Sequence, residues 1–559
     1  MQTLALRQTD PELAARYRAE GLWTDQSLGS FLHRCLVRNG RRELRVWSAN
    51  RPFRSSIAEV HDQALRMAGG LAERGIGPGD VVAFQLPNWP EAAAAFWGLA
   101  CLGAVLVPVV HFYGPKELGF ILEQSGARAL ITADRFGRAD YLEALEGLAP
   151  SLDRLELKVV VPADPGSPAP LPPGCVAFAE LAASERLSGP AALDPESPAL
   201  IAYTWGTTSD PKGVVHTHLS LTAEVIQMAR QWPAEERPGL MGAPVGHAIG
   251  MLGGLLGPLY RGQAVHLAEV WHPPAILAAF LEADLVFSGG ATYFLTSLLD
   301  DPSFRPEHLS HMRRAGLGGS PVPKAVADRA QKLGIEIMRS YGSTEHPSIT
   351  GALYDEPADK RAGTDGHPLA GVEVKLLDEA GAPVGPGTPG QIFSRGPELF
   401  AGYTDPSLTE KAFWPGGWYA TGDIGVMDED GWLTITDRLS DIIIRGGENI
   451  SAGEVEEQLL RLEGVAEAAV VAAPDARLGE HACAFLRLAP GARAPSMEEV
   501  RAHLAGAGLA RQKWPEELRV VQDLPRTPSS KVKKYVLRDQ LRAEAAARQA
   551  SLDSRPEAT

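Results

Sequence analysis

Residues 203–214 read Tyr203-Thr-Trp-Gly-Thr-Thr-Ser-Asp-Pro-Lys-Gly-Val214, between an apolar run at 199–202 and a helix-like run at 219–230. Glycines, hydroxyl side chains and a lysine after a strand suit a polyphosphate. Backbone N–H groups can approach its oxygens closely there, and Lys212 supplies positive charge. The order differs from GxxxxGK[ST], so this stretch is not a Walker A loop. Taken alone, it is also compatible with an ordinary polar turn.

Outward from this stretch, helical and strand-like patterns alternate through the first four hundred residues. Helix-like runs at 61–76 and 90–103 are each followed by a strand-like run, at 81–87 and 104–110. This alternation predicts an α/β fold of parallel sheets covered by helices. The uncharged run 92–110 is long enough to cross a bilayer, but its glycines and Pro108 favour a buried helix followed by a buried strand.

The pattern changes from about residue 437. Helix then strand is predicted within 454–475, a helix at 497–509 and a strand at 518–525, which together indicate a compact α+β unit. Its tail, residues 511–548, is locally basic in a chain whose net charge is −16. A basic run is usually a solvated helix face, but this one contains a candidate active-site lysine.

Composition excludes several classes of protein. The chain has 559 residues, of which 45% are hydrophobic and 22% charged, so disorder, collagen and disulfide-stapled miniproteins are ruled out. Its acidic balance makes it a poor general ligand for nucleic acid or anionic membranes. The four cysteines are far apart in sequence, so neither a disulfide framework nor a zinc site is expected. Reduced thiols and a charged N-terminus without a signal peptide fit a cytoplasmic protein.

The stretch YTWGTTSDPKGVVHTH (203–218) resembles the phosphate loop of the AMP-forming, or adenylate-forming, acyl-CoA synthetase and luciferase superfamily. Trp205 stands where that family usually has serine, and Ser209 where it usually has glycine, so no role is assigned to the hydroxyl that Trp205 replaces. The resemblance implies ATP contacts from the remaining positions of the loop: Thr204, Gly206, Thr207, Thr208, Lys212 and Gly213.

Other motifs of this family follow in family order. The segments Gly318-Gly319-Ser320-Pro321 and Tyr341-Gly-Ser-Thr-Glu345 resemble the adenine wall and the motif that binds adenine, α-phosphate and Mg²⁺. Thr421-Gly-Asp423 and Arg438 resemble the ribose-binding pair. The implied nucleotide-binding residues are Gly318, Gly319, Ser320, Tyr341, Gly342, Ser343, Thr344, Asp423, Arg438 and Lys531, with Glu345 as the metal ligand.

The C-terminal motifs complete the resemblance. Asp437-Arg438 begins a hinge motif with Ser440 as its pivot, and Gly446-Gly447-Glu448 resembles the loop that lines the pantetheine channel of CoA. Pro525-Arg-Thr-Pro-Ser-Ser-Lys531 resembles the catalytic lysine motif, with Ser530 in place of a usual glycine. The implied architecture is a large N-terminal domain, 1–437, that binds ATP and the acid, and a small mobile α+β domain, 438–559.

The implied reaction uses ATP, Mg²⁺ and CoA, with Lys531, Glu345, Thr344 and Lys212 as catalytic residues. A carboxylate that attacks ATP brings two anions together. Mg²⁺ on Glu345 and the charge of Lys212 would offset that repulsion. Lys531 would bridge the carboxylate and the α-phosphate, which is stabilisation by position and charge.

The acid is expected to be apolar and larger than acetate. The apolar stretch 242–260 lies where the family has its acyl pocket, and the resemblance places six residues at the pocket wall: His247, Gly289, Gly290, Ala291, Gly319 and Ser343. No aspartate lies near Val245 for an amino group, and Ser343 stands where acetate-activating relatives have tryptophan. A medium-chain, alicyclic or aromatic acid fits. The sequence as a whole most resembles bacterial cyclohexanecarboxylate-type and medium-chain ligases.

Three alternatives to an acid:CoA ligase stay open at this point. One is an acyl-AMP ligase that loads a carrier protein instead of free CoA, and a second is a luciferase-like oxidase. The third is a non-catalytic relative that only binds acyl groups or nucleotides, which the retention of Lys212, Glu345 and Lys531 disfavours. The expected partners are the small-molecule acid, ATP and CoA, without nucleic acid or stable membrane insertion, and a homodimer is compatible with the sequence.

Overall fold

The computed structural model describes residues 6–148, 152, 154–204, 211–232, 236–319, 322–445, 448–475, 477–526 and 532–553. Within them the chain forms two compact units. The first holds the described residues up to 374 together with 394–419, and the second holds 375–393 and the described residues from 420 onward. The expected boundary at 437/438 falls inside the second unit, and the division into functional domains stays a prediction.

The largest sheet of the first unit has eight strands in the order β21-β11-β10-β4-β3-β5-β8-β9. Strands from β10 to β9 run parallel, whereas β11 is antiparallel to both of its neighbours. The α/β fold expected from the alternating pattern is therefore confirmed. The bounds are β3 Val81–Gln85, β4 Val105–Val109, β5 Ala129–Ala133, β8 Leu157–Val161, β9 Cys175–Ala177, β10 Pro198–Thr204, β11 Lys212–Thr217 and β21 Gly402–Tyr403.

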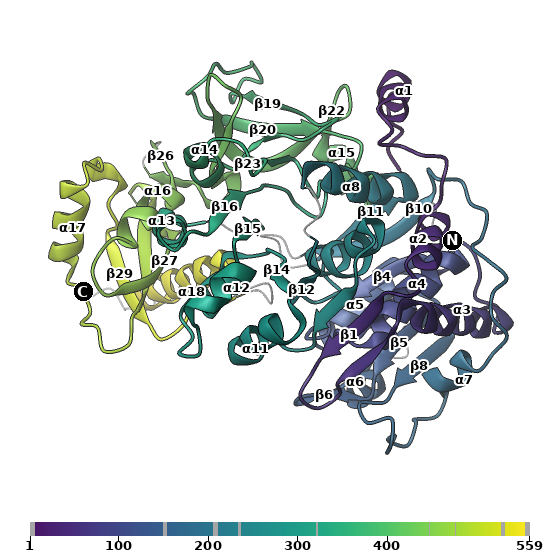
Figure 1. The fold of residues 1–559 in the computed structure, drawn as a ribbon. Coiled ribbons are helices and arrows are strands. Elements are labelled where there is room, and N and C mark those ends of the chain that lie inside the picture. Colours follow the sequence, from purple (N-terminus) through teal and green to yellow (C-terminus); the bar gives the residue numbers. More distant parts are fainter. Residues whose placement is uncertain are drawn as a thin grey trace. The chain divides into compact units, whose positions relative to one another are not determined.

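Helices cover both faces of this sheet (Figure 1). Successive strand residues point to opposite faces. Accordingly Val82 and Phe84 of β3 pack in the core with helices α3 (Ile57–Glu73) and α4 (Pro90–Leu102), while Ala83 packs with α5 (Pro115–Ser125). With both faces buried, the parallel strands need continuous apolar sequences, and β4 and β5 are buried at every position.

Helix α4 explains the uncharged run 92–110. A second sheet, in the order β14-β12-β13-β1-β2, packs its residues Leu44 and Val46 into the same core as α4. The helix is therefore buried on all sides, ends at the left-handed Gly103 and leads into β4, as predicted. None of the described helices is both long enough and apolar enough to span a bilayer. The bounds of the second sheet are β1 Glu43–Trp47, β2 Phe53–Ser56, β12 Gly239–Met241, β13 Val265–Ala268 and β14 Val286–Phe287.

Shorter elements complete the first unit. Strands β15 (Arg314–Leu317) and β16 (Glu336–Arg339) form a parallel pair, and β17 (Thr350–Gly351) pairs with β18 (His367–Pro368). The other helices are α1 Pro11–Ala19, α2 Leu28–Arg38, α6 Tyr141–Gly147, α7 Phe178–Ala182, α8 His218–Gln231, α9 Ala248–Gly250, a π-helix Met251–Leu256, α10 Gly257–Arg261, α11 Pro273–Ala283, α12 Thr292–Leu299, α13 Lys324–Lys332, α14 Ala358–Gly363 and α15 Pro406–Ala412.

Residues 373–438 form a five-stranded sheet in the order β19-β20-β23-β22, with β24 paired to β23. The C-terminal sheet has the order β26-β25-β28-β27, with β29 parallel to β28. The predicted helix–strand succession of this α+β region is confirmed. The bounds are β19 Glu373–Leu377, β20 Gly390–Arg395, β22 Phe413–Trp414, β23 Trp418–Met427, β24 Leu433–Arg438, β25 Ile443–Arg445, β26 Glu448–Ile450, α16 Ala452–Leu459, β27 Val465–Asp475, β28 Gly479–Leu488, α17 Met497–Gly506, β29 Glu517–Val521 and α18 Lys534–Asp553.

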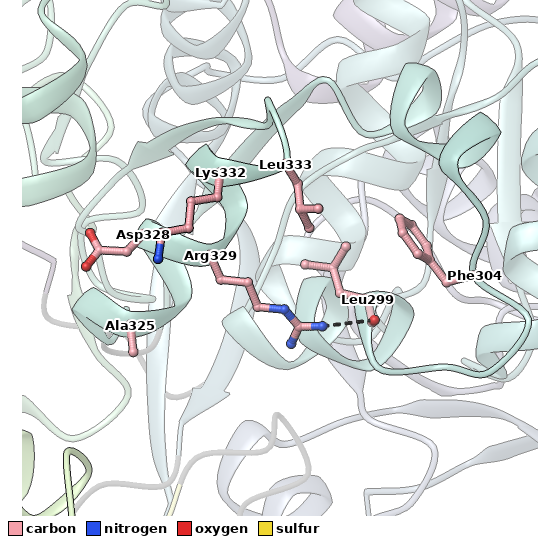
Figure 2. Close-up of a pocket in the computed structure, with 7 residues that line it drawn as sticks. All are labelled: Leu299, Phe304, Ala325, Asp328, Arg329, Lys332 and Leu333. Atoms are coloured by element: carbon pink, nitrogen blue, oxygen red, sulfur yellow. Dashed lines mark hydrogen bonds between the residues drawn. The ribbon is translucent and has the colours of Figure 1, made fainter.

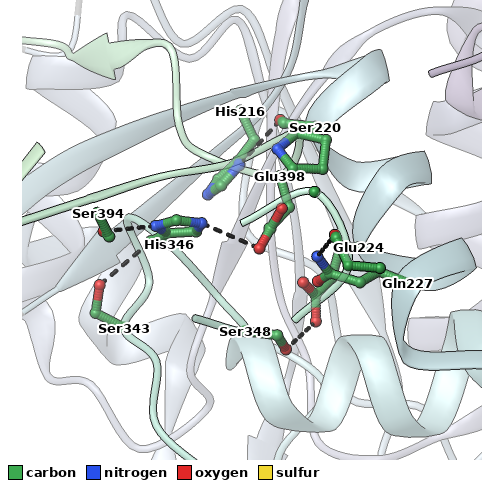
Figure 3. A network of polar contacts seen from close by, with 12 residues as sticks. His216, Ser220, Glu224, Gln227, Ser343, His346, Ser348, Ser394 and Glu398 are labelled. Atoms are coloured by element: carbon green, nitrogen blue, oxygen red, sulfur yellow. Dashed lines mark hydrogen bonds and ion pairs between the residues drawn. The ribbon is translucent and has the colours of Figure 1, made fainter. Parts of the chain in front are cut away.

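A network of buried polar side chains interrupts the apolar core of the first unit (Figure 3). His346 is fully buried and contacts Ser394 Oγ through Nδ1 (2.7 Å) and Glu398 Oε1 through Nε2 (3.0 Å). On α8, Glu224 accepts a hydrogen bond from Ser348 Oγ (2.7 Å). Within this network, three buried acceptor oxygens find no hydrogen-bond partner among the described residues: Glu224 Oε2, Gln227 Oε1 and Glu398 Oε2.

This excess of acceptors determines the charge of Glu224. Burial, and secondarily the nearby Glu398 carboxylate, raises the pKa of Glu224 to about 8. An ionised glutamate would lose its hydration without gaining donors, whereas a protonated one supplies a donor to this acceptor-rich pocket. The folded protein therefore holds a proton on Glu224 at neutral pH.

This proton predicts how stability depends on pH. Because the pKa of Glu224 is higher in the folded chain than in the unfolded chain, its stabilising contribution is present at low pH. That contribution is lost as pH rises from about 4.5 to about 8, by up to about 1.4 kcal/mol per pH unit. Glu224→Gln should remove this dependence, so its melting temperature relative to wild type should rise across that window in thermal unfolding monitored by near-UV circular dichroism. Glu123→Gln, on the exposed face of α5, is the control, and parallel wild-type and Glu224→Gln profiles would contradict the assignment.

Candidate active site

The proposed phosphate loop joins two neighbouring strands of the large sheet. Residues 205–210 lie outside the described residues, but their flanks are defined: Thr204 ends β10, and Lys212 begins β11 directly opposite it. Helix α8 starts only at His218, one strand later than a strand–loop–helix arrangement would place it. The loop is therefore flanked by two antiparallel strands, and the first described element after it is a strand and not a helix.

The hairpin places Lys212 beside Tyr403. Strand β21 pairs with β11, and the ammonium of Lys212 lies 5.8 Å from the centre of the Tyr403 ring. Gly213 is required here for packing, because a Cβ would come within 2.6 Å of Thr404 Oγ1. Lys212 and Gly213 were expected to contact ATP, and the structure adds a packing reason for the glycine.

Tyr403 also holds the predicted metal ligand. Its hydroxyl donates to Glu345 Oε1 over 2.8 Å. Burial raises the pKa of Tyr403 far above its usual value, and the Glu345 charge raises it further, so the hydroxyl keeps its proton and remains a donor. Tyr403 thus connects Lys212 and Glu345, and the sequence analysis missed it. The available signal was the sequence Gly402-Tyr403 after an apolar run at 399–401.

The backbone around Glu345 is fixed from two further directions. The Phe400 N–H donates to Glu345 O over 2.8 Å, and His216 Nε2 lies 2.7 Å from Thr344 O. Burial lowers the pKa of His216 to about 4, so the ring is neutral; Nε2–H donates to Thr344 O while Nδ1 accepts from Ser220 Oγ. His216 therefore helps to position Thr344, the predicted α-phosphate contact, and it too was missed.

The motif around Tyr341 folds back on itself. Tyr341 pairs with Thr350 through backbone hydrogen bonds, and the Ser343 N–H donates to His346 O. Gly342 is necessary at this turn, because a Cβ would lie 1.9 Å from Pro347 O. The predicted tyrosine, serine, threonine and glutamate are thereby presented from one rigid hairpin.

The predicted adenine wall and acyl pocket meet at glycines. The Gly290 N–H donates to Gly316 O over 3.0 Å, and the Gly318 N–H donates to Gly290 O over 3.1 Å. A Cβ on Gly319 would lie 3.2 Å from Ile249 Cδ1 of the acyl stretch. Three of these glycines have positive φ, +85° at Gly289, +134° at Gly290 and +74° at Gly319. They were interpreted as leaving room for the acid, but glycine is also required by the backbone.

The remaining predicted wall residues belong to neighbouring turns. His247 caps α9, with Nδ1 accepting from the Ile249 N–H over 3.4 Å, and Ala291 precedes α12. Ser343 Oγ accepts from the His346 N–H over 3.2 Å. The acyl stretch packs on the end of β4, since a Cβ on Gly246 would lie 2.6 Å from Val109 O. Its floor is thus the carboxyl end of a parallel strand, where α/β proteins generally bind ligands.

The second unit contains the predicted ribose pair. Asp423 of β23 lies directly opposite Arg438 of β24, and Arg438 Nε is 3.2 Å from Asp423 Oδ1. The carboxylate is buried while the guanidinium is half exposed, so the arginine can also donate to a ligand. The structure therefore brings these two residues together, as a shared role requires.

The proposed hinge is tied to the last helix. Arg538 of α18 donates through Nη1 to Ser440 O (2.9 Å) and to Asp441 Oδ1 (2.6 Å). Glu448 begins β26, the strand that follows the proposed pantetheine loop. Several predicted residues lie outside the described residues: Gly206, Thr207, Thr208, Ser320, Gly446, Gly447 and Lys531.

A hollow of roughly 600 Å³ lies apart from these motifs, between the end of α12 and α13 (Figure 2). Its arginine is already engaged, since Arg329 donates to Leu299 O and pairs with Asp300. None of the predicted site residues lines it, and we assign it no role in the chemistry. The lining residues are Leu299, Phe304, Ala325, Asp328, Arg329, Lys332 and Leu333.

Comparison with known proteins agrees with this geometry. Residues 33–404 match the AMP-binding enzyme family, and residues 454–531 match the AMP-binding enzyme C-terminal domain. The chain is 35% identical to a medium-chain fatty-acid–CoA ligase of Escherichia coli (strain K12), covering 94% of this chain and 92% of that protein. It is 33% identical to a 3-[(3aS,4S,7aS)-7a-methyl-1,5-dioxo-octahydro-1H-inden-4-yl]propanoyl:CoA ligase of Rhodococcus jostii (strain RHA1), covering 88% and 95%.

Among solved structures, ATP-bound MatB from Rhodopseudomonas palustris superposes with a TM-score of 0.82 at 26% identity, covering 92% of this chain and 99% of that one. The similarity thus covers most of the chain, including part of the C-terminal region. The chain belongs to the AMP-binding enzyme family, within the adenylate-forming acyl-CoA synthetase superfamily.

Proposed function

We propose that this protein is an ATP-dependent carboxylic acid:CoA ligase, which forms acyl-AMP with release of pyrophosphate and then transfers the acyl group to CoA. The observation that carries the proposal is the arrangement of Lys212, Tyr403 and Glu345 at the base of the loop hairpin. A cation and an oriented carboxylate that holds a metal ion would offset the repulsion between an acid and a triphosphate bound there. The names of the ligases similar to it support the same reaction.

The residues fit a magnesium ion that enters with ATP. Glu345 offers one carboxylate, and Mg²⁺ is commonly held by one or two carboxylates together with substrate phosphates. When bound, the ion would neutralise phosphate charge and favour departure of pyrophosphate. Tyr403 would keep the Glu345 carboxylate oriented, and Lys212 would add charge on the same side. Lys531 would contribute the last positive charge, from the C-terminal domain proposed to turn about Ser440.

We further propose an apolar acid larger than acetate, of the medium-chain, alicyclic or aromatic type. The acyl stretch offers no charged side chain apart from His247, and its neighbours at 289–291 and 319 are small. The two similar ligases are named for a medium-chain fatty acid and a bicyclic propanoate, which agrees with a roomy apolar pocket. Pyrophosphate release over a panel of acids, followed by thioester formation with free CoA or a holo carrier protein, tests both acid and acceptor. No release with any acid would refute the proposal.

The Glu345–Tyr403 contact predicts that substitutions at these two residues reduce the adenylation rate to different extents. Glu345→Gln should lower adenylation by about 10²–10³-fold, and Tyr403→Phe by about 10- to 100-fold, the worth of one hydrogen bond to a charged group. Pyrophosphate release at saturating acid measures both. Tyr17→Phe, which removes another buried hydroxyl, is the control. Full activity in Tyr403→Phe would show that the hydroxyl does not position Glu345.

Substitution of Lys531 should slow one half-reaction much more than the other. Lys531→Ala should lose about 10²–10³-fold in adenylation, the usual effect of removing one transition-state donor. It should retain most of its ability to convert supplied acyl-AMP and CoA into thioester. Lys533→Ala, which removes the same charge two residues away, should leave both steps unchanged. Equal losses of rate in adenylation and in thioester formation for Lys531→Ala would mean that Lys531 is a general nucleotide contact. It would then have no role specific to the adenylating arrangement of the C-terminal domain.

The preference of the enzyme for large or small acids should depend on Ile249 more than on the glycines of the proposed pocket. Ile249→Ala shortens the side chain opposite Gly319 and so enlarges the proposed pocket. It should raise kcat/KM for bulky acids relative to small ones by about 10-fold, a usual value for changes in pocket volume. Gly319→Ala places a side chain at φ +74° and should reduce activity with all acids alike. Hexanoate, decanoate and cyclohexanecarboxylate form a suitable series. Selective loss of bulky acids in Gly319→Ala would instead make that glycine a determinant of size.

A further inference from the structure

Three helices of the first unit approach one another unusually closely. A Cβ on Gly29 of α2 would lie 2.2 Å from Ala100 O of α4, and a Cβ on Gly98 of α4 would lie 2.5 Å from Ala64 O of α3. Residues three and four positions along a helix share its face. The faces brought together at these two glycines therefore also present His33 on α2, Cys101 on α4 and His61 on α3.

The side chains of these three residues converge. Their potential ligand atoms all lie within 4.8 Å of one another, and the imidazole rings of His33 and His61 are 5.1 Å apart between centres. Cys101 and His61 are buried, whereas His33 is partly exposed. The cluster is invisible as a sequence motif, because its members are separated by 28 and 40 positions along the chain.

Two nitrogen atoms of the cluster have no partner. His33 Nδ1 and His61 Nε2 are buried and make no hydrogen bond. A buried polar atom without a partner costs about 1–3 kcal/mol, so two such atoms in one cluster need an explanation. Burial lowers the pKa of His33, and it lowers that of His61 to about 4, so both rings are neutral with lone pairs available.

We propose that His33, His61 and Cys101 form a binding site for one thiophilic cation of the Zn²⁺ type. Three atoms within 4.8 Å of one another share a point at most about 2.8 Å from each, so shifts of at most about 0.5–0.8 Å bring them to zinc–ligand distances near 2.0–2.3 Å. Imidazole and thiolate are the ligands that Zn²⁺ and related ions prefer. Binding releases the thiol proton of Cys101, and the ion joins α2, α3 and α4.

The residues around the cluster permit a bound cation and restrict which metal it can be. Arg186 is the cation that acts on both histidines, but it is paired with Asp62 over 3.0 Å. The three ligand atoms are two imidazole nitrogens and one sulfur, with no carboxylate oxygen among them, so the set favours an ion with a strong sulfur bond. Mg²⁺ and Ca²⁺, which prefer oxygen, are therefore excluded from this site. The partly exposed His33 provides the route of entry.

Cadmium and cobalt titrations of the full-length protein test the site without any assay of activity. Wild type should bind one equivalent of Cd²⁺ or Co²⁺ with a thiolate charge-transfer band, and its melting temperature should rise with the metal. Cys101→Ser should lose the band. His33→Gln and His61→Gln should weaken binding by at least about 10-fold, since even outer partners of a metal are worth that much.

The matched control is Cys175→Ser, which alters another cysteine on β9 and should keep the band and the thermal shift. If Cys101→Ser fails to fold, the partly exposed His33→Gln provides the same test with little change to the core. A band that persists in Cys101→Ser, or a wild type that shows neither band nor thermal shift with either metal, would overturn the proposal. Because neither readout involves catalysis, these outcomes are independent of whether the protein is a ligase.

Discussion

Strand β11 holds the described part of the loop site together, because its register with β10 and β21 sets the positions of Thr204, Lys212 and Tyr403. Pairing with β10 puts Lys212 opposite Thr204, and pairing with β21 puts Tyr403 beside Lys212. Tyr403 in turn orients Glu345, whose own backbone is fixed by Phe400. A slip of one residue would move every side chain of β11 to the opposite face, so the site depends on backbone pairing more than on any single side chain.

The buried network around His346 and Glu224 supports the motif at 341–345 through polar contacts. Apolar residues of similar volume would be cheaper to bury, since ionisable groups lose hydration there. The network instead connects the segment after Glu345 to α8 and to the turn at 394–398. Directional hydrogen bonds restrict those segments to one arrangement, and such restriction suits residues that must meet a triphosphate in a defined orientation.

Sequence reasoning predicted the α/β alternation and the buried helix and strand at 92–110, because each rests on local pattern. It also grouped Asp423 with Arg438 from complete motifs; the structure pairs the two residues, and their ribose role stays a prediction. It placed the helix after the loop at 219–230, close to the observed His218–Gln231, but it did not predict the short strand β11 that lies between them. Tyr403 and His216 were missed because their partners lie 58 and 128 positions away. The positive φ of Gly289, Gly290 and Gly319 depends on backbone geometry that composition does not reveal. The trio of His33, His61 and Cys101 likewise arises only from helix packing.

The two ends of the eight-stranded sheet are short: β21 has two residues and β9 has three. A long exposed edge would offer rows of free N–H and C=O groups to a strand of another molecule. Here the long apolar strands β3, β4 and β5 are interior to the sheet and already paired on both sides. Little edge is left for a second chain to extend the sheet. The eight-stranded sheet of the folded protein therefore resists edge-to-edge aggregation.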